Sequence, residues 1–567
     1  MGEIVLDLLC HADFSGRIRP SREDIGFPAF SAEIAKLRAQ NPAGTLLLDA
    51  GDAFSTNYWP GLPLVGAMIR SKTDVMTLGN HEFDRGPAFL DSCISACPFP
   101  ILCANVRRKA DGAPVPGTKP WVLLERCGIR IGVLGLTTEY TPYMVEKSAF
   151  APFEMTSAAE AAARHIPAMR AAGADIVVVL THMPFYQAAD GTLTGELPEL
   201  IDASPAADVW IGGHIPGDCA QVRSGACVVK AGFGGASIAH VRLTLDAASH
   251  RILDRSCAVV QTDPNGQADP EITRYIRSVT DPFEPYFREP LGSLNERWRM
   301  TLAHESKLGD FLADCLRYGG QTELSYMNTT SACGELLPGE ITREELLYCA
   351  AFDDEMFTGI ITGAQLHALL EAVYEPERFG NNAAIAFSGF HAAVDHTRPG
   401  GQKVLSVTRP DGTPIAPDER LSVTVSAYGS AAMTPEPLPD RSTGNRPAAT
   451  ITRPSALMQS PSACSRSQTT RACTRPANRK TTTRPIERTE KAIDLSLRGA
   501  KRRGNLAAED LLFPECSGEF AVQSPHNGMT QRAAAAHRSG SNETYASSYR
   551  KSRPINSSNA RMTLPKN

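Results

Sequence analysis

Short apolar runs alternate with helix-forming stretches over the first 260 residues of the chain. The runs have the length and the continuous apolar character of strands that are buried on both faces. Residues 158–172, between two of these runs, have the Ala-rich content of a crossover helix. The alternation predicts a layered α/β domain. The expected strands are 4–9, 46–48, 75–78, 131–134, 176–180 and 209–211.

Residues 263–300 differ from the pattern before them, because they are rich in proline and in charged side chains. A helix is expected after Asp269, since Pro270 suits the first helical position. We therefore divide this part of the chain into a first domain over residues 1–262 and a helical linker over residues 263–300.

The apolar pattern resumes after the linker and predicts a second, smaller domain over residues 301–440. Residues 306–318 place their apolar side chains on one helical face. Thr342 and Glu345 have the spacing of a capping box at the start of another helix. Residues 421–428 alternate between apolar and polar positions, as a strand does. The mixture of elements indicates an α+β domain.

Residues 441–567 have a different composition from the rest of the chain. They carry 22 Lys and Arg against 8 Asp and Glu, whereas the first 440 residues carry 35 against 54. They are poor in aromatic residues and show no apolar period, so they cannot bury enough surface to offset the entropy of ordering. We expect a basic disordered tail here and a second domain that is truncated near residue 440. A frameshift that replaced the native C-terminus would explain this change.

The hydropathy of the chain also restricts where the protein is expected to be located and what it is expected to bind. No run of 18 or more apolar residues occurs, so no membrane-spanning helix is expected. The apolar stretch at 4–9 is too short for the core of a signal peptide. These features predict a cytoplasmic, monomeric protein that has neither a membrane nor a nucleic acid as its partner.

Polar side chains follow five of the predicted strands at the point where each strand ends. Sites in open α/β sheets are built at the carboxyl ends of the strands. Any one of these residues alone is explained as a cap, a turn residue or a satisfied histidine. Five separate strands that deliver such residues to one edge favour a functional site. The residues are Asp13, Asp52, Asn80 with His81, His182 and His214.

Carboxylate, amide and imidazole groups together indicate a divalent metal centre. This combination suits Zn, Mn, Fe, Co or Mg better than copper or an iron–sulfur cluster. Two such ions about 4 Å apart can bind a phosphate, activate water and stabilise the charge of an in-line displacement. Asp52 is placed to bridge two ions of this kind. The pattern therefore predicts a metal-dependent hydrolase.

The same residues carry a resemblance to a known superfamily. Their order along the chain resembles that of the calcineurin-type metallophosphoesterases, and the run 79–84 resembles the bacterial 5′-nucleotidase branch. The resemblance covers about residues 3–435. It implies a four-layer α/β/β/α catalytic domain followed by a 5′-nucleotidase C-terminal substrate-binding domain. The supporting segments are Gly51-Asp52, Gly79-Asn80-His81-Glu82, Thr181-His182, Gly213-His214, 102–105, 305–314, 339–342 and 362–366.

The resemblance implies two metal ions. It assigns a complete ligand set to one of them, which consists of Asp52, Asn80, His182 and His214. For the other ion it assigns Asp13 and the shared Asp52, together with two further ligands. Both further ligands are absent from this chain, which predicts one complete and one weakened subsite.

Ser15 stands where the family has a histidine, and Pro216 stands where it has a histidine or glutamine. A serine hydroxyl is a much poorer ligand for a divalent ion than an imidazole. His11 has the same parity as Asp13 and would face the same side in an extended chain. Asp218 lies two residues beyond Pro216. Either is an alternative ligand by position, although a structural or solvated role is favoured for both.

The resemblance also implies a catalytic dyad and a nucleobase site. His81 would stabilise the transferring phosphoryl group or protonate the leaving oxygen, and Asp84 would orient the imidazole. Phe352 and Tyr428 match the two aromatic residues between which the family holds the base, with a core role as an equal alternative. Cys333 replaces the substrate-binding arginine of the family, which should weaken anion binding.

Three functions are consistent with these residues. The first is a phosphoric ester hydrolase of the 5′-nucleotidase type that acts on nucleoside 5′-monophosphates or another small phosphoester. The second is a hydrolase of the same architecture, such as a 2′,3′-cyclic-nucleotide phosphodiesterase or a thiosulfate-ester hydrolase. The third is a weakened or inactive member that binds one metal. The intact dyad and ligand set favour the first, and the lost ligands favour the third.

Overall fold

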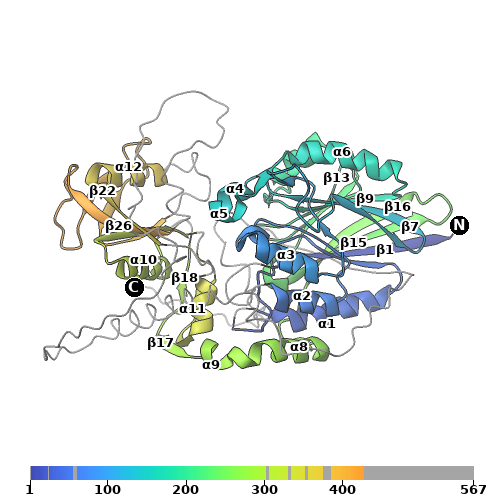
Figure 1. The fold of residues 1–567 in the computed structure, drawn as a ribbon, viewed down its shortest axis with the longest axis horizontal. Coiled ribbons are helices and arrows are strands. Elements are labelled where there is room, and N and C mark those ends of the chain that lie inside the picture. Colours follow the sequence, from blue (N-terminus) through green and yellow to red (C-terminus); the bar gives the residue numbers. More distant parts are fainter. Residues whose placement is uncertain are drawn as a thin grey trace, which may run out of the picture.

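The structure is a computed structural model, and two folded parts are visible in Figure 1. The predicted tail at 441–567 lies outside the described residues, as do Cys333, Phe352 and Tyr428. The structure describes residues 2–22, 24–54, 61–301, 305–329, 332, 334–350, 356–374 and 385–426.

The first domain contains two six-stranded mixed sheets. In the first sheet, β1 to β4 run parallel, while β15 is antiparallel to β1 and to β16. The carboxyl ends of β1, β2 and β3 therefore meet at one edge. The strand order is β16 (Ile252–Gln261), β15 (Ser237–Asp246), β1 (Glu3–His11), β2 (Thr45–Asp49), β3 (Val75–Thr77) and β4 (Ile101–Leu102).

The second sheet has a parallel centre and antiparallel edges. Strands β14, β12, β9 and β7 run parallel, and β13 and β6 are antiparallel to their neighbours. Strand β9 is buried along its whole length, as its continuous apolar run predicts. The order is β13 (Cys219–Arg223), β14 (Ala226–Lys230), β12 (Val209–Gly212), β9 (Ile176–His182), β7 (Ile129–Thr137) and β6 (Trp121–Arg126).

Helices cover the outer faces of the two sheets, which gives the predicted α/β/β/α layers. Helices α1 and α2 lie on one side and α6 on the other (Figure 1). The helices of this domain are α1 (Gly26–Gln40), α2 (Leu62–Arg70), α3 (Gly86–Ala96), α4 (Thr141–Met144), α5 (Lys147–Phe150), α6 (Ala158–Ala171) and α7 (Glu196–Ala203), with 3-10 helices η1 (His81–Phe83) and η2 (Phe233–Gly235). Two small hairpins pair β5 (Val106–Arg108) with β8 (Phe153–Met155) and β10 (Tyr186–Gln187) with β11 (Leu193–Thr194).

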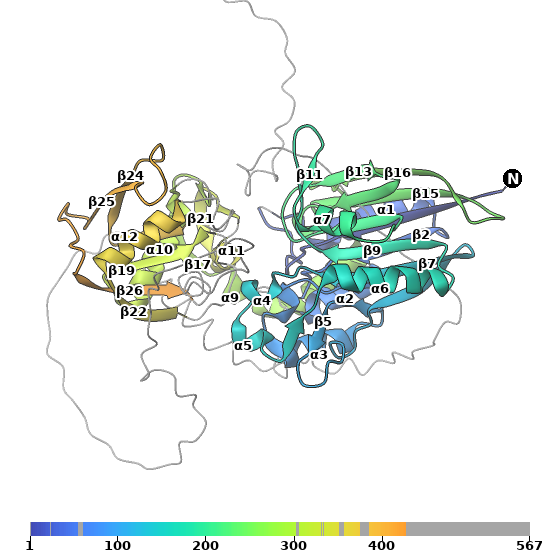
Figure 2. The same ribbon diagram turned by 90° about the horizontal axis from the view of Figure 1, so that it is seen from above.

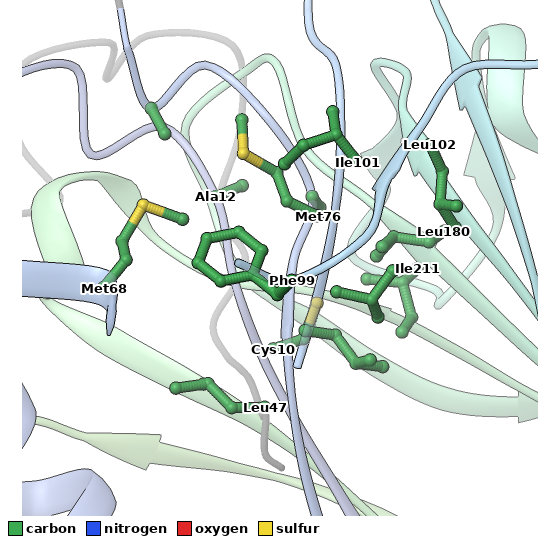
Figure 3. Close-up of a cluster of buried hydrophobic side chains, with 14 of the residues drawn as sticks. Cys10, Ala12, Leu47, Met68, Met76, Phe99, Ile101, Leu102, Leu180 and Ile211 are labelled. Atoms are coloured by element: carbon green, nitrogen blue, oxygen red, sulfur yellow. The ribbon is translucent and has the colours of Figure 1, made fainter. Parts of the chain in front are cut away.

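The two sheets meet face to face through apolar side chains. Cys10 and Leu102 from the first sheet lie on the side of Leu180 and Ile211 from the second (Figure 3). All four are almost completely excluded from solvent. Burial of this kind fixes the two sheets against each other, so the loops at their common edge rest on a rigid base.

A helical connector leads from the first domain to the second along one side of the molecule (Figure 1). It consists of α8 (Pro270–Thr280), η3 (Asp281–Phe283) and α9 (Glu284–Phe287). Helix α8 begins at Pro270 as predicted, and Asp269 caps it by accepting from the backbone N–H groups of Glu271 and Ile272.

The second domain is built on a four-stranded sheet with the order β22–β26–β19–β23. Thr342 and Glu345 form the predicted capping box at the start of α11. Strands β17 and β18, within the predicted linker, pair with β21 and β20. The strands are β17 (Pro290–Leu294), β18 (Trp298–Arg299), β19 (Leu324–Asn328), β20 (Glu335–Leu336), β21 (Gly339–Thr342), β22 (Met356–Thr362), β23 (Ile385–Ser388), β24 (His391–Val394), β25 (Val404–Thr408) and β26 (Arg420–Ser426), and the helices are α10 (Lys307–Gly320), α11 (Arg343–Cys349) and α12 (Gly363–Val373).

The loop that follows β1 contacts the second domain beside α11, while the two domains otherwise stand side by side (Figure 2). Arg22 forms an ion pair with Glu345 and donates to the Pro338 carbonyl at 3.1 Å. The guanidinium of Arg17 lies 4.7 Å from the ring centre of Tyr348. Among the described helices, none is long and apolar enough to cross a membrane.

The end of α10 gives a test of the second domain's packing. A Cβ on Gly320 would lie 1.8 Å from Thr424 Oγ1 on β26, whereas one on Gly319 would meet only the flexible end of Met356 at 3.3 Å. Gly320→Ala should therefore destabilise this domain by about 1–3 kcal/mol, as overpacked sites do. Gly319→Ala, the matched control, should be neutral or slightly stabilising. Urea unfolding followed by circular dichroism measures both, and equal midpoints would contradict this packing of α10 against β26.

Candidate active site

The loops after five strands bring the predicted polar residues together at one edge of the two sheets. Asp52, His182 and His214 offer ligand atoms that all lie within 4.8 Å of one another. Asp13 lies beside them, because its Oδ1 is 3.8 Å from His182 Nε2 and its Oδ2 accepts from the His214 N–H at 3.1 Å. The structure thus brings these residues together, while their roles as ligands stay a prediction.

The backbone is strained where these loops leave the strands. Asp13, Asp52 and His214 have φ angles of 56°, 56° and 75°, in the left-handed region that residues with a Cβ rarely adopt. The strained loops support one another, since the Asp13 N–H donates to the Gly51 carbonyl at 2.9 Å. Strain that persists in several neighbouring loops is typical of a functional site.

Gly79 explains why its motif begins with glycine. A Cβ at this position would lie 2.2 Å from Asp52 Oδ1 and 2.8 Å from His182 Cδ2. Only glycine therefore allows the loop after β3 to approach the other two loops this closely.

His182 has a fixed orientation. Its Nδ1 lies 2.8 Å from the Ala50 carbonyl, which can only accept, so Nδ1 carries the proton. This leaves Nε2 facing Asp52 Oδ2 at 2.8 Å, although the geometry there is not that of a hydrogen bond. Metal-bound histidines commonly donate their other ring N–H to a carbonyl in this way.

Three buried polar atoms around Asp52 have no hydrogen-bond partner among the residues that the structure describes. They are His182 Nε2, His214 Nδ1 and Asn80 Oδ1. Buried polar atoms are nearly always satisfied, so three together need a common explanation. Two imidazole nitrogens, an amide oxygen and a carboxylate form a donor set that suits a divalent ion. The residues of this first subsite therefore fit the metal that the resemblance implies.

The electrostatics of the site agree with this assignment. Burial raises the pKa of Asp52, but His182 and His81 more than offset it and hold the pKa below its usual range. Burial lowers the pKa of His182, yet Asp52 and Asp13 raise it to about 9. Burial lowers the pKa of His214 to about 3, which keeps its ring neutral. Metal binds the ionised carboxylate and the neutral imidazole, so Asp52 and His214 are in the binding form, whereas His182 would release its Nε2 proton when the ion binds.

The second subsite does not fit a metal ion in the same way. The Ser15 hydroxyl donates to the Asp52 backbone carbonyl at 3.3 Å. Pro216 has no ligand atom in its side chain, and its carbonyl accepts from Lys230 at 3.4 Å. Of the ligands that the resemblance assigns to this ion, the described residues therefore retain Asp13 and Asp52.

Neither of the alternative ligands replaces what is lost. The His11 ring packs against Phe14 and Phe30, with centroid distances of 5.6 and 5.0 Å, and burial lowers its pKa to about 3. The expectation that His11 and Asp13 face the same side is wrong, because β1 ends at His11 and the chain is no longer extended at Asp13. Asp218 accepts from Ser237 Oγ at 3.0 Å and from the Gln261 side-chain amide at 3.3 Å.

His81 and Asp84 form the contact that a dyad requires. His81 Nδ1 lies 2.9 Å from Asp84 Oδ2, and the His81 backbone N–H donates to Asp52 Oδ1 at 2.9 Å. Burial lowers the pKa of His81, but Asp84 and Asp52 raise it to about 10. The ring is therefore protonated near neutral pH. Its side chain is 20% exposed, so it is open to a substrate.

Glu82 has a role at this site that the sequence analysis missed. Its completely buried carboxylate accepts from the backbone N–H groups of Asp52, Ala53 and Phe54, each at 2.8 Å, and of Gly79 at 2.7 Å. It thereby ties the loop after β2 to the loop after β3. The one indication in the sequence was a charged residue within a motif that is otherwise buried. Its partners are backbone groups, which a sequence does not display.

The predicted nucleobase residues Phe352 and Tyr428 cannot be added to this geometry, since they lie outside the described residues. Their role stays a prediction, as does the expected weakening of anion binding by Cys333.

Known proteins resemble the chain in both sequence and fold. The family model for calcineurin-like phosphoesterase matches residues 10–218, and the model for the 5′-nucleotidase C-terminal domain matches residues 290–433. The chain is 25% identical over 417 residues to the snake venom 5′-nucleotidase of Naja atra, which covers 66% of this chain and 77% of that protein.

Two further similarities show the breadth of these relatives. The chain is 24% identical over 424 residues to the endonuclease YhcR of Bacillus subtilis (strain 168), covering 71% of this chain but only 34% of that protein. The 5′-nucleotidase precursor from Thermus thermophilus has a solved structure that superposes with a TM-score of 0.64 and 21% identity, covering 75% of this chain and 90% of that one. An identity this low supports a common fold alone.

Glu82→Gln tests the role of the buried carboxylate. The amide retains one acceptor oxygen, so two of the four backbone N–H groups would face a donor. Each lost bond costs about 1–3 kcal/mol, and we expect a loss of at least about 2 kcal/mol in unfolding free energy. Urea unfolding measures this loss, with the exposed Glu154→Gln as control. Equal stability of the two variants would contradict the assigned role.

Proposed function

We propose that the chain, which belongs to the 5′-nucleotidase family, hydrolyses nucleoside 5′-monophosphates. It combines a calcineurin-like phosphoesterase domain with a 5′-nucleotidase C-terminal domain. One observation carries the proposal. The Asp52, His182 and His214 cluster lies beside the His81–Asp84 pair, so a metal site and an acid catalyst share one edge. This is the arrangement that phosphoester hydrolysis requires.

Each side chain has a distinct task in the proposed reaction. A divalent ion bound at this set supplies Lewis acidity to the phosphoryl group and lowers the pKa of a water molecule. Asp52, His182, His214 and Asn80 would hold that ion. The Nδ1–H bond of His182 to the Ala50 carbonyl fixes the ring, so that its Nε2 faces Asp52 and would be available to the ion.

His81 acts on the substrate oxygens. Asp84 accepts from the Nδ1–H of His81, so the Nε2–H is left to face the site, where Nε2 lies 3.9 Å from Asp52 Oδ2. The protonated ring donates a hydrogen bond to the phosphoryl group and passes its proton to the leaving 5′-oxygen. Water replaces the nucleoside on phosphorus, and the products are the nucleoside and inorganic phosphate.

The choice of a nucleotide rests on the second domain. The match to a 5′-nucleotidase C-terminal domain and the similarity to a snake venom 5′-nucleotidase support a nucleoside monophosphate. The similarity to an endonuclease makes a phosphodiester the competing substrate class. Parallel assays with AMP and bis(p-nitrophenyl) phosphate distinguish them, and faster cleavage of the diester would reject the monophosphate.

Removal of metal should abolish the activity. Treatment with EDTA followed by gel filtration is expected to reduce AMP hydrolysis to the level of a blank, and added Mn²⁺ should restore it, because the bound ion supplies the Lewis acid. Asp52→Ala should stay near the blank with Mn²⁺ present, while the exposed Asp91→Ala should behave like the unmodified protein. Full hydrolysis by the metal-free protein would exclude this mechanism.

Loss of the His81 ring should slow the chemical step. His81→Ala is expected to lower kcat for AMP by about 10²–10⁴-fold, the usual contribution of a general acid. Asp84→Asn should cause a smaller decrease, since the ring is present but less well oriented. The metal content of both variants should be unchanged. His165→Ala on α6 serves as control, and a kcat for His81→Ala within twofold of this control would refute the assignment.

A further inference from the structure

Lys230 is a buried cation next to the loop that carries His214. It is the last residue of β14 and pairs in register with Gly212, two residues before His214. Its side chain is almost fully buried, and its Nζ donates to the carbonyls of Phe185 at 2.8 Å and of Pro216 at 3.4 Å. Among the described residues, no carboxylate forms an ion pair with this ammonium group.

The loop between β12 and β13 lies between Lys230 and Asp13. On one side, the His214 N–H donates to Asp13 Oδ2 at 3.1 Å. On the other side, the Pro216 carbonyl accepts from Lys230. A Cβ on Gly213 would lie only 3.4 Å from Asp13 Oδ2, so the loop is in close contact with that carboxylate. Burial lowers the pKa of Lys230, and Cys219, Asp13 and Asp218 oppose this by favouring the charged form.

The position of Lys230 coincides with the defect in the second metal subsite. Pro216, whose carbonyl Lys230 contacts, stands where a side-chain ligand is missing. Burial raises the pKa of Asp13 to about 7, and His182 and Lys230 oppose this shift by favouring the ionised form. A buried carboxylate needs a compensating charge. Burial lowers the pKa of Lys230 to about 8, which still leaves it mainly protonated at neutral pH.

From this juxtaposition we infer that the ammonium of Lys230 takes the place of the second divalent ion, so that the chain uses one metal and one fixed cation. The inference rests on the proposed function for the role of the first metal. It assigns Lys230 as a positioning residue, which stabilises Asp13 and holds the loop of His214 without touching the substrate. A fixed cation beside Asp13 also repels a second divalent ion.

Metal stoichiometry tests the inference without any assay of activity. The metal-free protein is titrated with Mn²⁺, and free Mn²⁺ is followed by electron paramagnetic resonance. The unmodified chain should bind one Mn²⁺ per molecule. Lys230→Gln keeps a hydrogen-bond donor but removes the charge, and it should raise the affinity for a second Mn²⁺ by about tenfold or more. Lys230→Arg keeps the charge and should bind one ion.

The exposed Lys109→Gln is the control for a general change in charge and should match the unmodified chain. Two tightly bound ions in the unmodified chain would overturn the inference, and this result does not depend on how any variant folds. Unchanged binding of the second ion in Lys230→Gln would overturn it as well. A chain that binds one ion but does not cleave AMP would reject the proposed function and leave the metal count standing. Two bound ions together with full AMP hydrolysis would reject the inference about Lys230 and leave the proposed function standing.

Discussion

The buried carboxylate of Glu82 is the interaction on which the site depends. Its two oxygens accept hydrogen bonds from four backbone N–H groups in the loops after β2 and β3. These loops carry Asp52 and Asn80. Charge-assisted bonds of this kind are shorter and stronger than neutral ones. They offset part of the cost of burying the charge, although burial still raises the pKa of Glu82, and they fix the spacing between the two loops. The close approach at Gly79 and the strained backbone of Asp52 are possible because this anchor holds both loops in place.

The same anchor adds to an excess of buried negative charge, which determines the electrostatics of the site. Asp13, Asp52 and Glu82 lie within electrostatic reach of His182, and together they raise its pKa above neutral despite its complete burial. The edge of the two sheets is therefore a place where positive charge is favoured. A divalent ion, the His81 imidazolium and the Lys230 ammonium are three ways to supply that charge. The number of ions that bind therefore depends on how much positive charge the protein's own side chains supply.

Much of this arrangement could be predicted from the sequence, and the remainder has a physical explanation. Asp52 and His182 were identifiable because apolar strands end directly before them, and parallel strands bring their carboxyl ends to one edge. The direction of His11 was not predictable from parity, since the backbone turns left-handed at Asp13. The role of Glu82 was hidden because its partners are backbone N–H groups. Lys230 was hidden because its partners are the backbone carbonyls of Phe185 and Pro216, which a sequence does not display.

The loop after β1 links the geometry of the site to the placement of the second domain. Asp13 and Ser15 lie at its start, and Arg17 and Arg22 continue from them to contact α11. The first residues of this loop are tied to the loop after β2 by the Ser15 N–H, which donates to the Asp52 carbonyl at 2.9 Å. A movement of α11 with the rest of the second domain would therefore reach Asp13 through this loop. Ser15, one of the two positions where a metal ligand is missing, lies in this same loop. In the proposed one-metal arrangement, the charge beside Asp13 comes instead from Lys230 on β14, which is held by the Phe185 and Pro216 carbonyls and not by the loop that contacts the second domain.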